Sequence, residues 1–132
     1  MKTLFRVYDN ELKKYRTEKD GDYSLGVLSG RVRGIYGERF DDMEAEQFSG
    51  LISMDNKKAY FNDIIEYQNT EGEAKKALIW YDEQLHCLMV GNFPYHKLYN
   101  SGFIQPSKLE FFIIGNLRQN PELIKSLNYG NP

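Results

Sequence analysis

The feature that most constrains the fold is a pair of apolar runs joined by a short polar connection. Residues 77–81 read Ala-Leu-Ile-Trp-Tyr, residues 85–90 read Leu-His-Cys-Leu-Met-Val, and Asp-Glu-Gln lies between them. Apolar runs of this length, bounded by turn-forming residues, are typical of strands, and the polar triplet suits a tight connection. The sequence therefore predicts a β-hairpin, the clearest in the chain.

Several other segments have the length of strands and end at turn signals. They are residues 4–8, 13–16, 23–28, 32–36, 60–67 and 109–114. Residues 41–47 are expected to form one helical turn or a loop, and residues 91–108 an irregular segment. Asn120 can cap a helix, Pro121 suits the first helical position and Glu122 favours the helix start, which predicts a short helix near the C-terminus.

These elements predict a mostly β fold of the α+β class. We expect a small twisted antiparallel sheet or a barrel-like β domain with a short C-terminal helix. The chain has 132 residues, a common size for one domain, and no repeat or linker interrupts it. Residues 1–132 are therefore predicted to form a single domain.

Composition excludes several classes of protein. With 14% aromatic residues and a net charge of −2, wholesale disorder is not expected, and general nucleic-acid binding is disfavoured. One cysteine, Cys87, rules out an intrachain disulfide. The first residues lack the apolar run of a signal peptide, and no stretch approaches the roughly 20 apolar residues of a membrane span. We expect a cytoplasmic protein with no membrane association.

The charge is unevenly distributed along the chain. Residues 1–40 hold nine Lys or Arg and six Asp or Glu, residues 41–73 two against nine, and residues 74–132 six against four. The acidic middle segment is either a solvated surface or a partner for the basic N-terminal part, in the same chain or in a neighbouring copy.

No catalytic, metal or cofactor site is expected. His86, Cys87 and His96 are the only soft metal ligands, which is fewer than a closed zinc site needs. Apolar neighbours suggest a buried, inert Cys87 thiol rather than a nucleophile. Four carboxylates are candidates for acid–base work, but no pattern brings two of them together: Asp63, Glu66, Asp82 and Glu83.

One basic cluster is a candidate nucleic-acid interface. Arg31 and Arg33 alternate on a predicted strand, so both are expected on one face, with Tyr36 and Arg39 close behind. Aromatic and basic side chains of small β domains bind single-stranded nucleic acid in this way. A solvated strand face is the other interpretation.

Two stretches resemble the YopX family, small proteins of bacteriophages and prophages. Residues 50–65 resemble its core motif, which runs from Gly-Leu through a turn to an aromatic residue and Asp-Ile. Residues 112–124 resemble its ending, a strand into Ile-Gly-Asn followed by an Asn-Pro-Glu-Leu helix. Asn56 and Asn62 replace two glycines of the motif, and Asn tolerates positive φ. Residues 16–45 and 91–108 match nothing in the family pattern.

The motif residues are interpreted as structural. They are Gly50, Leu51, Tyr60, Asp63, Ile64, Gly115, Asn116 and Pro121. Gly50 is expected to allow a bend or close approach, and Asp63 to accept backbone N–H bonds at a strand entry.

The resemblance implies a phage or prophage origin, a β-rich fold and no known reaction. The first hypothesis is a non-enzymatic protein-interaction module without a cofactor, which forms a homo-oligomer or binds a host or phage protein. Arg31, Arg33 and the acidic stretch 41–46 are expected to carry its contacts. The alternative is a single-stranded nucleic-acid binder that uses the Arg31 cluster.

Overall fold

The structure, a computed structural model, describes residues 5–16, 26–28, 31–33, 39–69, 71–100 and 109–127. It divides the chain into two compact units, Met1–Phe48 and Ser49–Pro132. Both units are built from antiparallel strands, which confirms the β-rich fold class predicted from the sequence. Whether the chain behaves as the single domain that its length predicts stays a prediction.

The N-terminal unit contains one antiparallel sheet with the strand order β2-β1-β5-β4-β3. Its strands are β1 (Phe5–Asp9), β2 (Lys14–Tyr15), β3 (Gly26–Leu28), β4 (Arg31–Arg33) and the first part of β5 (Arg39–Ile52). The β1–β2 and β3–β4 pairs confirm two connections predicted from the sequence, although residues 23–25 and 34–36 lie outside the described residues.

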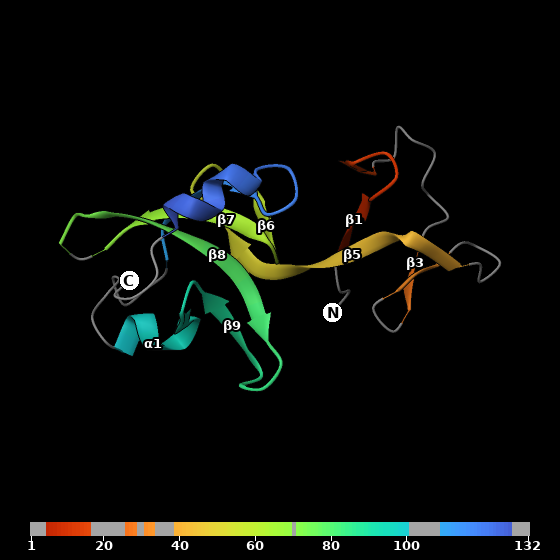
Figure 1. Ribbon diagram of the computed structural model, residues 1–132. Coiled ribbons are helices and arrows are strands. Elements are labelled where there is room, and N and C mark those ends of the chain that lie inside the picture. The colour runs from red at the N-terminus through yellow and green to blue at the C-terminus, as the bar shows by residue number, and fades with distance from the viewer. Residues whose placement is uncertain are drawn as a thin grey trace. The chain divides into compact units, whose positions relative to one another are not determined.

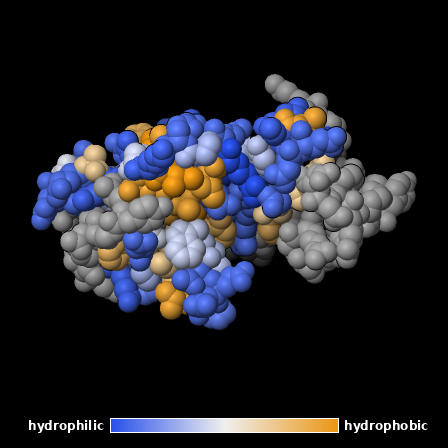
Figure 2. Space-filling view, viewed as in Figure 1, coloured by the Kyte–Doolittle hydropathy of each residue, from blue (hydrophilic) through white to orange (hydrophobic). Residues whose placement is uncertain are grey.

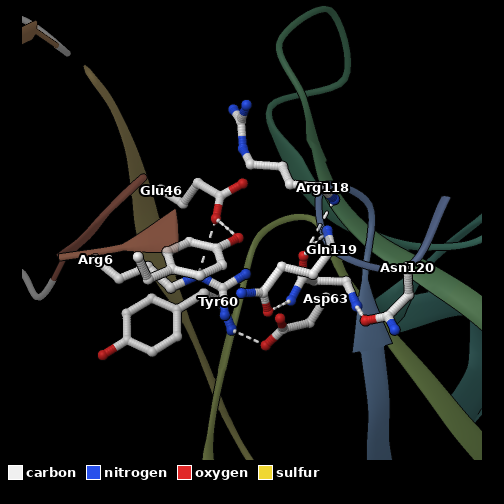
Figure 3. A network of polar contacts seen from close by, with 9 residues as sticks. Arg6, Glu46, Tyr60, Asp63, Arg118, Gln119 and Asn120 are labelled. Carbon is white, nitrogen blue, oxygen red and sulfur yellow. Dashed lines mark hydrogen bonds and ion pairs between the residues drawn. The ribbon is translucent and has the colours of Figure 1, made fainter. Parts of the chain in front are cut away.

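The helical turn or loop expected at residues 41–47 is wrong, because this segment belongs to the long strand β5. Residues 43–47 pair with β1, from Asp9 opposite Met43 to Phe5 opposite Gln47. The strand pattern was hidden because Glu46 is buried, with an exposed fraction of only 3%. Its carboxylate accepts hydrogen bonds from Arg6 Nε at 2.8 Å and from the Tyr15 hydroxyl at 2.6 Å (Figure 3).

Asp9 fixes the turn between β1 and β2. One carboxylate oxygen accepts the backbone N–H groups of Glu11 and Leu12 at 2.9 and 3.1 Å. The other accepts a charge-assisted bond from Arg16 at 2.8 Å. The hydrogen bond from the Leu12 backbone, with those from Arg16 and Glu11, lowers the pKa of Asp9, and burial opposes that shift.

The C-terminal unit contains a five-stranded antiparallel sheet in the order β10-β9-β8-β7-β11 (Figure 1). In addition, the end of β5 pairs with β6. The elements are β6 (Lys58–Tyr60), β7 (Asp63–Gln68), β8 (Ala74–Asp82), β9 (Cys87–Val90), β10 (Phe93–Pro94), α1 (Tyr95–Asn100), β11 (Phe111–Asn116) and the 3-10 helix η2 (Pro121–Ser126). The β8–β9 pair is the hairpin predicted from the apolar runs.

The main core lies on one face of this sheet. Alternate residues of β7, β8 and β11 are buried there and meet Leu98 of α1. The core consists of Ala59, Ile65, Tyr67, Ala77, Ile79, Val90, Leu98, Leu109 and Phe111. Figure 2 shows apolar residues gathered over β8, bordered by hydrophilic residues of η2 and of the β8–β9 turn.

Three further expectations need correction in this unit. Residues 60–67 are not one strand, because Asn62 takes φ 78° between β6 and β7. Within the irregular segment expected at 91–108, residues 93–100 form β10 and α1, and residues 101–108 lie outside the described part. The C-terminal helix exists, but Asn120 makes no capping bond to it. Its side-chain oxygen instead accepts the backbone N–H of Asn116 at 3.2 Å.

Helix η2 packs closely against the end of β11. Gly115 is the contact point, since a Cβ built there would lie 2.7 Å from Asn120 Oδ1 and 2.8 Å from Leu123 Cδ1. Gly115 is paired with Ile64 of β7, which is completely buried although it lies outside the main core cluster. The missing side chain at residue 115 thus lets η2 cover the second face of the sheet.

We expect Gly115→Ala to destabilise the protein by roughly 1–3 kcal/mol, because the added methyl group must displace Asn120 or Leu123. Urea unfolding followed by far-UV circular dichroism measures the loss. Gly72→Asn is the control, since residue 72 faces open space at φ +79°, which Asn tolerates. Equal midpoints for Gly115→Ala and the wild type would contradict the close approach.

The lowered pKa of Asp9 predicts a pH-dependent N-terminal unit. Its carboxylate contributes stability above the unfolded pKa of about 3.9, and that contribution is lost as the pH falls through the lower folded value. We expect amide signals of the β1–β2 turn to shift below about pH 4 in nuclear magnetic resonance (NMR) spectra. Asp9→Asn should remove this transition and Asn10→Ser should keep it; an unchanged transition in Asp9→Asn would assign it to another group.

Candidate functional site

The predicted arginine cluster lies in the N-terminal unit. Arg31 and Arg33 lie in β4, and the backbone register places Arg33 opposite Arg39 of β5 and Arg31 opposite Glu44. Tyr36 lies outside the described residues. The structure therefore brings three of the four predicted positions together at backbone level.

The acidic stretch 41–46 does not form one exposed surface. Glu44 is exposed, whereas Glu46 is directed into the unit and bound to Arg6 and Tyr15. The Arg6 guanidinium also lies 4.3 Å from the centre of the Tyr15 ring, a cation–π contact. Glu46 is therefore a structural residue, and the hypothesis that it contacts a partner is not supported.

Of the residues weighed for catalysis or metal binding, Asp82, Glu83, His86 and Cys87 lie together at the β8–β9 hairpin, where Asp82 pairs with Cys87, whereas Asp63 and Glu66 lie on β7 and His96 on α1. His86 lies in the exposed β8–β9 turn at φ 52°, His96 is exposed on α1, and Cys87 is a half-buried free thiol. Asp63 is buried, while Asp82 accepts two backbone N–H bonds in its turn. Across the described ranges, no group of three or more His, Cys, Asp or Glu is placed to hold a metal ion.

The motif residues meet where β7 begins and β11 ends. Asp63 pairs with Asn116 and Ile64 with Gly115, so the two stretches that resemble the family motif are neighbours in the sheet. Asp63 is 1% exposed and accepts the Tyr60 backbone N–H at 2.8 Å (Figure 3), which confirms the predicted strand-entry bond.

The Asn116 side chain organises the turn that follows β11. Its oxygen accepts the N–H groups of Arg118 and Gln119, and its amide donates to the Gln119 side chain at 2.9 Å. Pro121 then begins η2.

In the other motif stretch, Gly50 has φ +90° with nothing within 4 Å of its Cβ position, so it supplies a bend rather than a close approach. The next residue, Leu51, packs against the core.

A groove of about 730 Å³ lies in the C-terminal unit at the other end of the β7–β11 pairing, where β7 ends and β11 begins. Its floor is formed by β7 and the start of β11, and its borders by the turn after β5 and the β7–β8 turn. The described lining residues are Met54, Glu66, Tyr67, Gln68, Asn69, Gly72, Glu110 and Phe112. None of these residues was singled out as a binding residue from the sequence.

Local structure explains how each border is held. The Met54 backbone N–H donates to the Phe111 carbonyl at 2.9 Å, which fixes the turn after β5 against β11. Asn69 accepts the backbone N–H groups of Glu71 and Glu73, which holds the β7–β8 turn closed. Both borders are therefore built before any ligand arrives.

The groove combines apolar and acidic side chains. Phe112 and Met54 are 53% and 50% exposed, and both line this one groove. Glu66 and Glu110 supply two carboxylates, and no Lys, Arg or His is among the described lining residues. Burial raises the pKa of Tyr67 to about 12, so its hydroxyl stays neutral and protonated at physiological pH.

The sequence carried a partial signal for this site. The run 109–114 alternates in the structure, with Leu109 and Phe111 buried and Glu110 and Phe112 exposed. The paired phenylalanines concealed that alternation, because two adjacent aromatic residues read as a fully buried strand.

Comparison with known proteins places the chain in a family. The family described as YopX protein matches residues 4–125. None of the curated proteins compared with the chain matches it.

Two solved structures share the fold at 15% sequence identity. Protein EF1440 from Enterococcus faecalis has a TM-score of 0.57, with 94% of this chain and 99% of that chain covered. Protein yopX from Bacillus subtilis has a TM-score of 0.52, with 93% and 98% covered. The family match spans both units and includes both motif stretches, which confirms the resemblance noted in the sequence. The chain belongs to the YopX family.

Proposed function

We propose that the protein is a non-enzymatic interaction module, encoded by a phage or prophage, that works in the cytoplasm of a bacterial host. It binds a protein partner through the groove of the C-terminal unit. The observation that carries this proposal is the pair of half-exposed apolar side chains, Phe112 and Met54, that line the groove.

Several features of the groove suit binding rather than chemistry. Aromatic residues and Met are enriched at protein interfaces, where they supply most of the apolar contact area. The lining adds amides and carboxylates that give orientation and specificity. The motif residues at the other end of the β7–β11 pairing, such as Asp63 and Asn116, are occupied with backbone hydrogen bonds, so they support the sheet instead of facing a ligand.

No helix in the described part of the chain has the length and apolarity needed to cross a membrane.

Affinity capture from a bacterial lysate tests the proposal, with the protein immobilised and retained proteins identified by mass spectrometry. We expect at least one protein to be retained by the wild type and lost with Phe112→Lys, because a charge replaces the central apolar contact. Leu85→Lys is the matched control, since Leu85 is 60% exposed in the β8–β9 turn outside the groove. The purified partner should then form a complex of defined mass by light scattering. If no retained protein depends on Phe112, the groove is not the binding site.

Single-stranded nucleic-acid binding is the second candidate, favoured by the register that sets Arg33 opposite Arg39. Light scattering with short single-stranded DNA and RNA separates the two functions. We expect no gain in mass at physiological salt. A gain that weakens as salt rises, and that Arg33→Ser with Arg39→Ser removes, would replace the protein-binding proposal.

A further inference from the structure

We infer that the groove of the C-terminal unit takes a short, extended, basic peptide segment that carries an apolar side chain between Lys or Arg residues. This inference rests on the proposed function and names the chemistry of the partner.

The charge of the described lining residues is of one sign. Glu66 and Glu110 are the only acidic side chains among the described lining residues, which include no basic residue; Lys76, the cross-strand partner of Glu66 on β8, is not one of them. A cationic segment is therefore attracted to the groove, whereas a phosphate backbone or an acidic peptide is repelled.

The geometry places a carboxylate beside an aromatic ring. Glu66 on β7 is the direct cross-strand partner of Phe112 on β11, and such partners have Cβ atoms about 4.5–5.5 Å apart. Glu110 comes two residues before Phe112, and both are exposed while Phe111 between them is buried. Phe112 thus has one acidic neighbour across the sheet and another along its own strand, so a Lys or Arg can pair with a carboxylate while its stem covers the ring.

Met54 provides the complementary apolar contact. It lies on the turn that is hydrogen-bonded to Phe111, and its unbranched thioether adapts to side chains of different shape. An apolar side chain of the partner segment therefore fits between Met54 and Phe112. Gln68 lies two residues after Glu66 on the same face of β7, and its side-chain amide can form a hydrogen bond with the peptide backbone.

The size of the groove limits the occupant. A volume of about 730 Å³ is in the range that encloses a drug-sized molecule. A few residues of an extended chain fill this space, whereas the surface of a folded domain does not enter it. The occupant is thus a segment.

NMR titration of the full-length isotope-labelled protein tests the inference. The probes are three acetylated, amidated heptapeptides: Lys-Leu-Lys-Phe-Lys-Leu-Lys and the same sequence with every Lys changed to Glu or to Ser. We expect the basic peptide to shift the signals of Phe112, Met54 and Glu66, and to bind at least about tenfold more tightly than the other two. Glu66→Gln with Glu110→Gln should weaken binding about tenfold.

Glu83→Gln with Glu122→Gln is the matched control, because it removes two exposed carboxylates outside the groove and is expected to leave binding unchanged. Equal weakening by both pairs would reduce the effect to net charge and overturn the inference. If all three peptides shift the NMR signals of the groove residues equally, and Phe112→Lys removes these shifts, the inference is overturned while the proposed function is supported.

Two other outcomes also overturn the inference. If no peptide shifts the NMR signals of the groove residues, a basic segment is not the occupant. The lysate capture then decides separately whether the groove binds a folded protein. If the NMR signals of the groove residues shift with protein concentration in the absence of peptide, a second copy of the chain is the occupant.

Discussion

The pairing of β7 with β11 is the interaction on which the C-terminal unit depends. The two strands are far apart in sequence, and their register joins Asp63 to Asn116 at one end and Tyr67 to Phe111 at the other. Phe111 and Tyr67 then belong to the main core, while Gly115 beside Ile64 admits η2 on the opposite face. One pairing thus closes the core, positions the last helix and accounts for the two stretches by which the family is recognised.

The groove is a consequence of the same register. A strand with one buried face must direct its other side chains outward, so burying Phe111 exposes Phe112 beside Glu66. The turn after β5 is held against β11 by the Met54–Phe111 hydrogen bond, and this adds the second apolar side chain. The motif residues therefore act on the proposed binding site through the sheet, without facing the ligand.

Much of the fold could be predicted from local sequence. The β8–β9 hairpin, the turn at Asn56 and the final helix follow from residue type, because Asn tolerates positive φ and Pro121 begins a helix. Strand β5 could not be predicted, because its buried Glu46 is satisfied by Arg6, 40 residues away. The groove was missed for a similar reason, since cross-strand partners such as Phe112 and Glu66 cannot be deduced without the register.

Amide hydrogen exchange of Asn116→Ala tests most directly whether the motif turn secures the β7–β11 pairing that presents the groove. The substitution removes the side chain that organises the turn after β11, a loss of about 1–3 kcal/mol for buried hydrogen-bonding groups. The account predicts that amides of β11 and of its partner β7 exchange at least about tenfold faster, while β8–β9 amides keep their protection. Unchanged protection in β11, or an equal loss across the whole sheet, would contradict it.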